Sequence, residues 1–305
     1  MSEPTLPRRN LGSLPDRILD VLRPVLPRRL RGDIPIVPVV RLTGIIGFST
    51  PLKPGLTLTG ITRALDRAFS MRHAKAVALL INSPGGSPVQ SHLIFRRIRL
   101  LAEEKGLPVI AFVEDVGASG GYMIACAADE IICDASSMLG SIGVVGGSFG
   151  FDKLLEKVGI ERRLYTSGER KAMLDPFLPE NPEDVKRLKQ IQNEIHQGFI
   201  ALVKERRGRR LEGPEKTLFS GEYWTGARAV ELGIADAVGD LRTTLRERYG
   251  DEVLTPLIAP ERGFFGRRLR GAGLGGIEQL LSRPGFAEEI VSALEARALW
   301  SRYGL

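Results

Sequence analysis

Cysteine is scarce in this chain of 305 residues, which contains only Cys126 and Cys133. Two cysteines without a CxxC spacing exclude a disulfide framework and favour a reducing compartment. No run of about 18 apolar residues occurs, so we expect no membrane span, and the N-terminal arginines lack the apolar stretch of a cleaved signal peptide. Aromatic residues make up 6% of the chain, too few for platforms that stack single-stranded nucleic acid. We therefore expect a cytoplasmic protein that binds no nucleic acid.

Histidine is scarce as well, with three in the chain. His73 and His196 fall in charged segments, and His92 follows a glycine-rich turn within an expected helix. None stands in such a turn or at the end of an expected strand. We therefore expect each to be a surface or packing residue, which disfavours a Ser-His-Asp triad.

The chain does have an ordinary globular composition, with 43% hydrophobic and 26% charged residues, and a net charge of +7. Residues 1–32 hold seven arginines against three acidic residues, so much of the positive excess lies in this arm. A basic helix that contacts a membrane of anionic lipid peripherally and a solvated tail both fit the arm, and we favour the tail. The remainder is nearly balanced, so the basic pI does not indicate a nucleic-acid groove.

From residue 34 to about 245, short apolar segments alternate with segments of helical periodicity. Strands are expected at 34–48, 76–81, 107–113, 130–133 and 162–166, and helices at 57–72, 88–105, 151–158, 181–207 and 225–232. This alternation predicts an α/β fold with a mainly parallel sheet that is buried on both faces. In such sheets ligands bind beyond the carboxyl ends of the strands.

Composition divides the chain into three parts. A basic, Arg- and Pro-rich arm (1–32) precedes one core (33–247), and a linker with a C-terminal helical tail (248–305) follows it. The tail contains a basic, glycine-rich linker at 261–276 and an expected helix at 284–304. Because apolar residues follow a flexible linker, we hypothesise that residues 284–305 pack over or near a neighbouring site.

Two of the expected strands end in glycine-rich turns. In NSPGGS at 82–87 the glycines, Gly86 among them, allow close backbone approach, and N–H groups before a helix can hold a negative oxygen. In GASGGY at 117–122, Ser119 stands between a strand and an apolar helix, where a nucleophile would be exposed beside the N–H group of Gly120. An ordinary strand-to-helix turn and a helix N-cap serine are the alternative interpretations. Neither turn is a phosphate loop, because GxxxxGK[ST] is absent.

A serine nucleophile needs a base, and Lys171 is the one lysine at a strand-end turn with an apolar flank, in SGERK at 167–171. Desolvation lowers the pKa of a lysine towards the value that a general base needs, and residues 172–174 are apolar. A carboxylate partner would keep the amine protonated, so we expect Glu169 and Asp175 to point away. A solvated surface lysine is the alternative interpretation.

Four motifs in this order resemble the signal peptide peptidase A family of serine–lysine peptidases, which belongs to the Clp-protease/crotonase superfamily. They are SPGGS (83–87), VGASGGY (116–122), LGSIGV (139–144) and SGERK (167–171). The resemblance covers about residues 35–245. It implies an α/β fold of the crotonase/Clp-protease type, a ββα superhelix with a mainly parallel sheet and a single catalytic core.

The resemblance also implies roles for five residues. Ser119 would be the nucleophile, Lys171 the general base, and Ser141 a hydrogen-bond partner of the lysine amine. The N–H groups of Gly86 and Gly120 would form the oxyanion hole. The implied activity is that of a serine endopeptidase that hydrolyses short unfolded or signal-peptide-like hydrophobic peptides through an acyl-enzyme. No cofactor and no metal ion are expected, and the implied assembly is a homo-oligomer whose sites face an enclosed chamber.

Three other functions remain open from the residues alone. A crotonase-like acyl-CoA enzyme uses the same paired N–H groups but needs a carboxylate in place of Ser119 and Lys171. A non-catalytic scaffold of the same fold needs neither side chain. A Clp-type peptidase with a histidine base needs His92 or His196 beside the serine.

Overall fold

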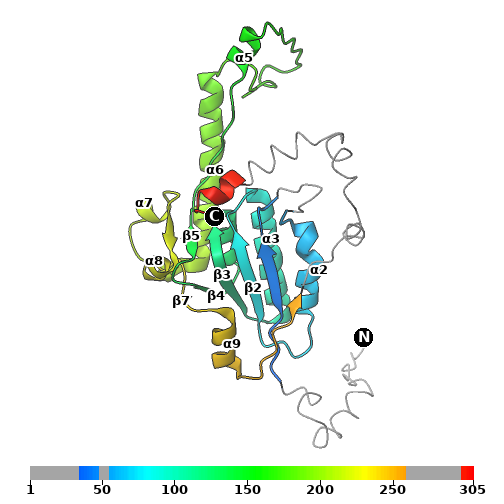
Figure 1. Cartoon of the computed structure of the whole chain (residues 1–305), viewed down its shortest axis with the longest axis vertical. Helices are drawn as coiled ribbons and strands as arrows, with labels where there is room; N and C mark the ends of the chain where they lie inside the picture. Colours follow the sequence, from blue (N-terminus) through cyan, green and yellow to red (C-terminus); the bar gives the residue numbers. More distant parts are fainter. Residues whose placement is uncertain (1–33, 48–54, 259–296) are drawn as a thin grey trace, which may run out of the picture.

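The computed structural model describes residues 34–47, 55–258 and 297–305, which Figure 1 shows in colour. The predictions made for the basic arm (1–32), for the linker at 261–276 and for most of the expected helix at 284–304 lie outside these residues. Within the described ranges, no helix combines the length and the apolar character needed to cross a bilayer.

One sheet organises the core, and nearly all of its strand pairs are parallel. Its main path runs β6-β5-β3-β2-β1-β8, while β4 pairs with β3 and β7 pairs with β4. Only β5 and β6 pair antiparallel among the named strands. The strands are β1 (Val39–Thr43), β2 (Val77–Ser83), β3 (Val109–Ala118), β4 (Glu130–Cys133), β5 (Met138–Gly140), β6 (Tyr223–Thr225), β7 (Ala237–Val238) and β8 (Leu257–Ile258). The predicted α/β fold with a mainly parallel sheet is confirmed.

The helices begin and end where local chemistry favours it. The hydroxyl of Ser87 accepts a hydrogen bond from the N–H group of Gln90 at the start of α3, Pro88 fills its first turn, and Gly106 ends it with φ 62°. The helices are α2 (Leu58–Phe69), α3 (Pro88–Lys105), α4 (Gly120–Ala125), α5 (Asp152–Lys157), α6 (Pro182–Arg207), α7 (Glu215–Leu218), α8 (Gly226–Glu231) and α9 (Leu241–Tyr249).

Side chains that alternate along β2 and β3 fill two apolar clusters, one on each face of the sheet. Leu79 and Ile81 belong to the larger cluster, which includes buried residues of α2, α3 and α4. Ala78 and Phe112 belong to the smaller one, with Leu245 of α9. Each fully buried Leu, Ile or Phe stabilises the fold by about 1.5–3 kcal/mol. This burial on both faces holds the carboxyl ends of β2 and β3 in fixed positions.

Three expectations about strands need correction. Residues 162–166 form no strand, because nothing in the described chain pairs with them. Strand β3 does not end at 113 but continues to Ala118, where its last residues pair with β5. Within the run 34–48, regular strand is confined to Val39–Thr43. In addition, β8 lies beyond residue 247 and still pairs with β1 in the core sheet.

Residues 144–181, here called the projecting arm, extend away from the sheet together with the first turns of α6 (Figure 1). The arm contains α5, and its fold depends on local contacts. The Arg162 guanidinium lies 2.6 Å from a carboxylate oxygen of Asp175 and 4.9 Å from the ring centre of Phe177. The N–H group of Phe151 donates to the carbonyl of Pro176 at 2.6 Å.

Candidate active site

Ser119 occupies a strained turn between β3 and α4. Its φ of 52° and ψ of −121° lie in a region that residues with a side chain rarely adopt. Its N–H group donates to the carbonyl of Gly140 at 2.8 Å, which fixes the turn against β5. The serine stands at the N-cap position, yet its side chain makes no capping hydrogen bond. The hydroxyl is therefore not used to cap α4, and the alternative of an N-cap serine is not supported.

The first glycine turn packs directly against Ser119. A Cβ atom on Gly85 would lie 2.8 Å from the Cβ of Ser119 and 2.9 Å from the amide nitrogen of Gly120. A Cβ atom on Gly86, where φ is 142°, would lie 2.2 Å from the carbonyl oxygen of Ile46. Only glycine fits at either position without a backbone shift.

Two backbone N–H groups at this junction take no part in the hydrogen bonds between the described backbone segments. Ile46 bonds the residues on each side of Gly86, donating to the carbonyl of Gly85 at 2.8 Å and accepting from Ser87 at 2.8 Å. These two hydrogen bonds, which join Ile46 to the turn, do not use the N–H group of Gly86. Neither that group nor the N–H of Gly120 has an acceptor among the residues that the structure describes. Two such donors beside a serine can stabilise an oxyanion.

Ser141 lies on the other side of the Ser119 turn. It follows Gly140, the residue whose carbonyl accepts from Ser119, and its own N–H donates to the carbonyl of Glu222 at 2.6 Å. Its φ is 53°, so this turn is strained as well. The structure thus brings Ser119, Ser141 and the two glycines Gly86 and Gly120 to one end of the sheet.

Lys171 is not part of this group in the single chain. It lies in the projecting arm between α5 and α6, and its side chain is exposed. Asp175 pairs with Arg162 instead, and the hydrogen bond from Arg162 holds the pKa of that carboxyl below its ordinary value. No ion pair joins Lys171 to Glu169 or Asp175 in the described part of the chain.

The histidines do not supply a base in this arrangement. His73 and His92 are exposed. The Nε2 atom of His196, on α6, lies 3.0 Å from the carbonyl oxygen of Ile142. Among the described residues, no hydrogen bond joins a histidine to Ser119. The alternative with a histidine base is therefore not supported.

Several supporting residues could not be found from the sequence. Ser83 donates to the carbonyl of Gly44 at 2.6 Å and accepts from the N–H of Gly85, which ties the first glycine turn to the loop after β1. Ser91, on α3, is buried against Gly120. Tyr303, at the C-terminal end, is 6% exposed, and burial raises the pKa of its phenol.

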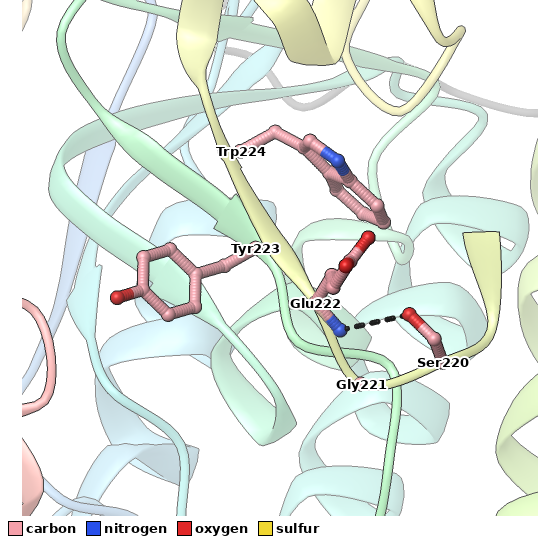
Figure 2. A pocket seen from close by; sticks show the side chains of 5 residues that line it. All are labelled: Ser220, Gly221, Glu222, Tyr223 and Trp224. Carbon is pink, nitrogen blue, oxygen red and sulfur yellow. Dashed lines mark hydrogen bonds between the residues drawn. The ribbon is translucent and has the colours of Figure 1, made fainter. Parts of the chain in front are cut away.

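An open hollow of about 700 Å³ lies next to Ser141, lined by Ser220–Trp224. Figure 2 shows Tyr223 and Trp224 on opposite sides of β6, and the hydrogen bond of 3.2 Å from the N–H of Glu222 to the hydroxyl of Ser220. A second hollow of about 670 Å³ lies in the projecting arm and α6. No group of three or more His, Cys, Asp or Glu side chains within the described residues is arranged to hold a metal ion.

Comparison with known proteins identifies the class. The family model "Peptidase family S49" matches residues 102–251. The candidate protease MJ0651 of Methanocaldococcus jannaschii is 31% identical over 215 residues, which cover 68% of each chain. "Serine protease SPPA, chloroplastic" of Arabidopsis thaliana is 34% identical over 221 residues, covering 70% of this chain and 32% of that protein.

A longer relative matches almost the whole chain. The "Na(+)/H(+) antiporter NhaA" of Brucella abortus (strain 2308) is 51% identical over 297 residues, covering 96% of this chain and 40% of that protein. The chain therefore spans less than half the length of this relative. The S49 model falls within the matched stretch, so the two proteins share the peptidase-family region, and the larger part of the antiporter lies outside the match.

The mainly parallel sheet, with a serine turn at its carboxyl end, places the chain in the class of peptidases with the Clp-protease-like fold. Within that class the chain belongs to peptidase family S49, the family of the SppA proteases. The expected family and fold are thereby confirmed.

Proposed function

We propose that this protein is a serine endopeptidase in which Ser119 is the nucleophile and Lys171 is the general base. The observation that carries the proposal is the strained Ser119 turn, whose hydroxyl does not cap α4. The turn stands beside the N–H groups of Gly86 and Gly120, which have no acceptor among the described residues. An acyl-transfer enzyme needs this combination of an exposed nucleophile and paired oxyanion donors. A crotonase-like acyl-CoA enzyme would use the donors but not the serine.

The base would come from a second copy of the chain. Free lysine has a pKa of about 10.4, so an amine in water is protonated at neutral pH and cannot accept a proton. A base role for Lys171, which is exposed in the single chain, requires a partner surface that covers it. The projecting arm carries many exposed large apolar side chains, which favour burial in a homo-oligomer. They include Val145, Phe149, Leu154, Val158, Ile160, Leu164 and Tyr165.

The reaction would proceed in two steps. The neutral amine of Lys171 accepts the Ser119 proton as the serine oxygen bonds to the peptide carbonyl carbon, and Gly86 and Gly120 N–H groups bind the resulting oxyanion. The lysine then protonates the leaving amine, and an acyl-enzyme remains. In the second step the lysine takes a proton from water as the water oxygen bonds to the acyl carbon. The bond from that carbon to the Ser119 oxygen then breaks, the lysine returns the proton to Ser119, and the acid is released. Loss of one oxyanion donor costs about 10²–10³ in rate.

The substrates would be short unfolded or signal-peptide-like hydrophobic peptides. An extended peptide binds well along a strand edge, where main-chain hydrogen bonds supply affinity. Strand β6 is the last strand at one end of the main path of the sheet. The carbonyl of Glu222, which directly precedes β6, accepts from the N–H of Ser141, and the open hollow is lined by Ser220–Trp224. This edge is where we place the substrate.

Labelling with a fluorophosphonate and hydrolysis of hydrophobic peptides across pH test the proposal together. The wild type should be labelled, and its rate should rise through an apparent pKa well below the ordinary lysine value. Ser119→Ala should lose label and activity, and Lys171→Ala should lose activity, whereas exposed controls Ser136→Ala and Lys216→Ala should keep both. Persistent labelling of Ser119→Ala, or an active Lys171→Ala variant, would overturn the assignment.

A further inference from the structure

The two central strands of the sheet, β2 and β3, lie side by side, and each leads into one half of the candidate site (Figure 1). Strand β2 ends in the first glycine turn, and β3 ends at the serine turn. The strands are in register at the pair Ile81–Val113 and again at the pair Ser83–Gly117. Between these pairs β2 has one residue, whereas β3 has three, residues 114–116, here called the bulge. Strand β3 therefore contains two residues more than regular pairing with β2 requires.

The bulge decides which residue of the first glycine turn faces the nucleophile. Gly117 pairs with Ser83, so Ser119, two residues further on, lies beside Gly85. The contacts agree, because a Cβ atom on Gly85 would lie 2.8 Å from the Cβ of Ser119. Without the extra residues, regular pairing would carry Ser119 two positions further along β2, a shift of about 6–7 Å. The serine would then no longer lie beside Gly85 and Gly86, and the candidate oxyanion donors would be misplaced.

Side chains from both neighbouring strands hold the bulge. From β2, the Nδ2 atom of Asn82 donates to a carboxylate oxygen of Asp115 at 2.6 Å, which joins the single residue of β2 to the middle of the bulge. From the connection before β5, the hydroxyl oxygen of buried Ser137 lies 3.2 Å from the carbonyl oxygen of Val113 and 2.5 Å from that of Glu114. Bulges commonly lie next to active sites, where they redirect a side chain.

The amide of Asn82 is committed to Asp115. Its Oδ1 atom is buried and has no hydrogen-bond partner among the described residues. A buried acceptor without a partner destabilises a fold, and such atoms are rare in native proteins. Turning the amide over would set Oδ1 against the Asp115 carboxylate, where two acceptors repel each other. The hydrogen bond to the charged carboxylate is therefore kept although it leaves Oδ1 unsatisfied.

We propose that Asn82 and Asp115 are positioning residues, whose hydrogen bond fixes the bulge and thereby sets Ser119 beside the N–H groups of Gly86 and Gly120. This role rests on the proposed function, because it acts through the nucleophile and the oxyanion donors. Neither side chain is part of the substrate edge at β6, so the pair acts on the chemical step rather than on peptide binding. A displacement of about 1 Å in a reacting group can lower a rate about 10²-fold.

An exchange of the two side chains tests the role. Asn82→Asp sets two carboxylates against each other and should lower kcat and the rate of fluorophosphonate labelling by about 10–100-fold, with KM unchanged. Asp115→Asn keeps a neutral amide pair and should lie between this variant and the wild type. The double variant restores an amide and a carboxylate in exchanged places and should regain most of the lost kcat. The control Asp66→Asn removes the partner that Arg97 contacts at 2.6 Å between α2 and α3, and it should leave kcat unchanged.

Urea denaturation of each variant shows which ones are folded at the assay temperature. If Asn82→Asp fails to fold, Asp115→Asn decides the question, and an unchanged kcat in that variant overturns the role. An active wild type whose folded Asn82→Asp variant keeps its kcat, loses only in KM, or is not rescued by Asp115→Asn overturns the positioning role alone. A wild type that is neither labelled by fluorophosphonate nor hydrolytic overturns the proposed function, and this role with it.

Discussion

Adding one methyl group at Gly120 should disable the nucleophile turn without unfolding the protein. A Cβ atom there would lie 2.3 Å from the Oγ atom of Ser91, against 3.2 Å from Ile46 Cδ1 and 3.3 Å from Ser91 Cβ. Only the first contact is too short for a small adjustment to relieve. The Ser91 side chain is buried and its hydroxyl is held by a hydrogen bond of 2.8 Å to the carbonyl of Ser87, so we expect the start of α4, and with it the N–H group of Gly120, to move. Displacing one oxyanion donor lowers kcat by about 10²–10³, or about 3–4 kcal/mol in the transition state.

The conflict involves one oxygen atom, so a second substitution should relieve it. Ser91→Ala removes that oxygen and leaves contacts of 3.2 and 3.3 Å, which allow the turn to return. The double variant should regain most of the lost kcat/KM. Ser91→Ala alone loses the hydrogen bond of 2.8 Å to the carbonyl of Ser87 and should cost about 1 kcal/mol of stability.

Steady-state peptide hydrolysis and thermal unfolding measure both effects. Gly198→Ala, on α6, is the matched control. A Cβ atom at Gly198 would meet nothing within 4 Å, so this substitution should leave kcat/KM unchanged. Ala favours a helix over Gly by about 1 kcal/mol, so Gly120→Ala should lose far more activity than stability. Wild-type activity in Gly120→Ala, or a double variant no faster than the single one, would refute this reasoning.

Three further predictions concern the core. Asp236→Asn removes the partner of the buried Arg207 guanidinium and should cost about 3–5 kcal/mol of unfolding free energy, measured by urea denaturation. Burial alone would raise the pKa of Asp236, but the hydrogen bonds from Arg207 and from the N–H of Ile131, together with the charges of Arg207 and Arg210, outweigh it and lower the pKa. This stabilisation is present above about pH 4 and fades as the pH falls through the folded pKa, a loss that the variant should lack. Burial raises the pKa of Cys126 to about 12 and that of Cys133 to about 11, so iodoacetamide at pH 8 should modify both only after denaturation. Gly233→Ala would place a Cβ atom 1.5 Å from the carbonyl oxygen of Arg210, and a circular-dichroism melt should show strong destabilisation.

Elements with clear local signals could be predicted from the sequence. The start of α3 is set by Ser87 and Pro88 and its end by Gly106, and both expected bounds agree with the structure. The Ser119 turn could be found because small residues surround a serine between an apolar strand and an apolar helix. These signals are local, so they do not depend on what packs nearby.

Elements that depend on distant partners could not be predicted. Glu114 and Asp115 look like the end of a strand, yet β3 continues through them because Arg41 pairs with Glu114 at 2.7 Å and Asn82 donates to Asp115 at 2.6 Å. Residues 162–166 have strand-like side chains, but a strand also needs a neighbour, and the projecting arm provides none within the described chain. No periodicity links Tyr303 to Val116 and Ala118, since their packing depends on the tertiary fold.

Mixing two inactive variants tests most directly whether the lysine of one copy serves the serine of another. Ser119→Ala and Lys171→Ala chains are to be denatured together in equal amounts, refolded, and assayed for peptide hydrolysis beside each variant refolded alone. If each site takes its lysine from a neighbouring copy, half of the sites have the serine and half of those have the lysine, so about a quarter of the wild-type activity should return. Wild-type chains refolded in the same way must regain activity for comparison. A mixture that stays as inactive as its two components would contradict the account.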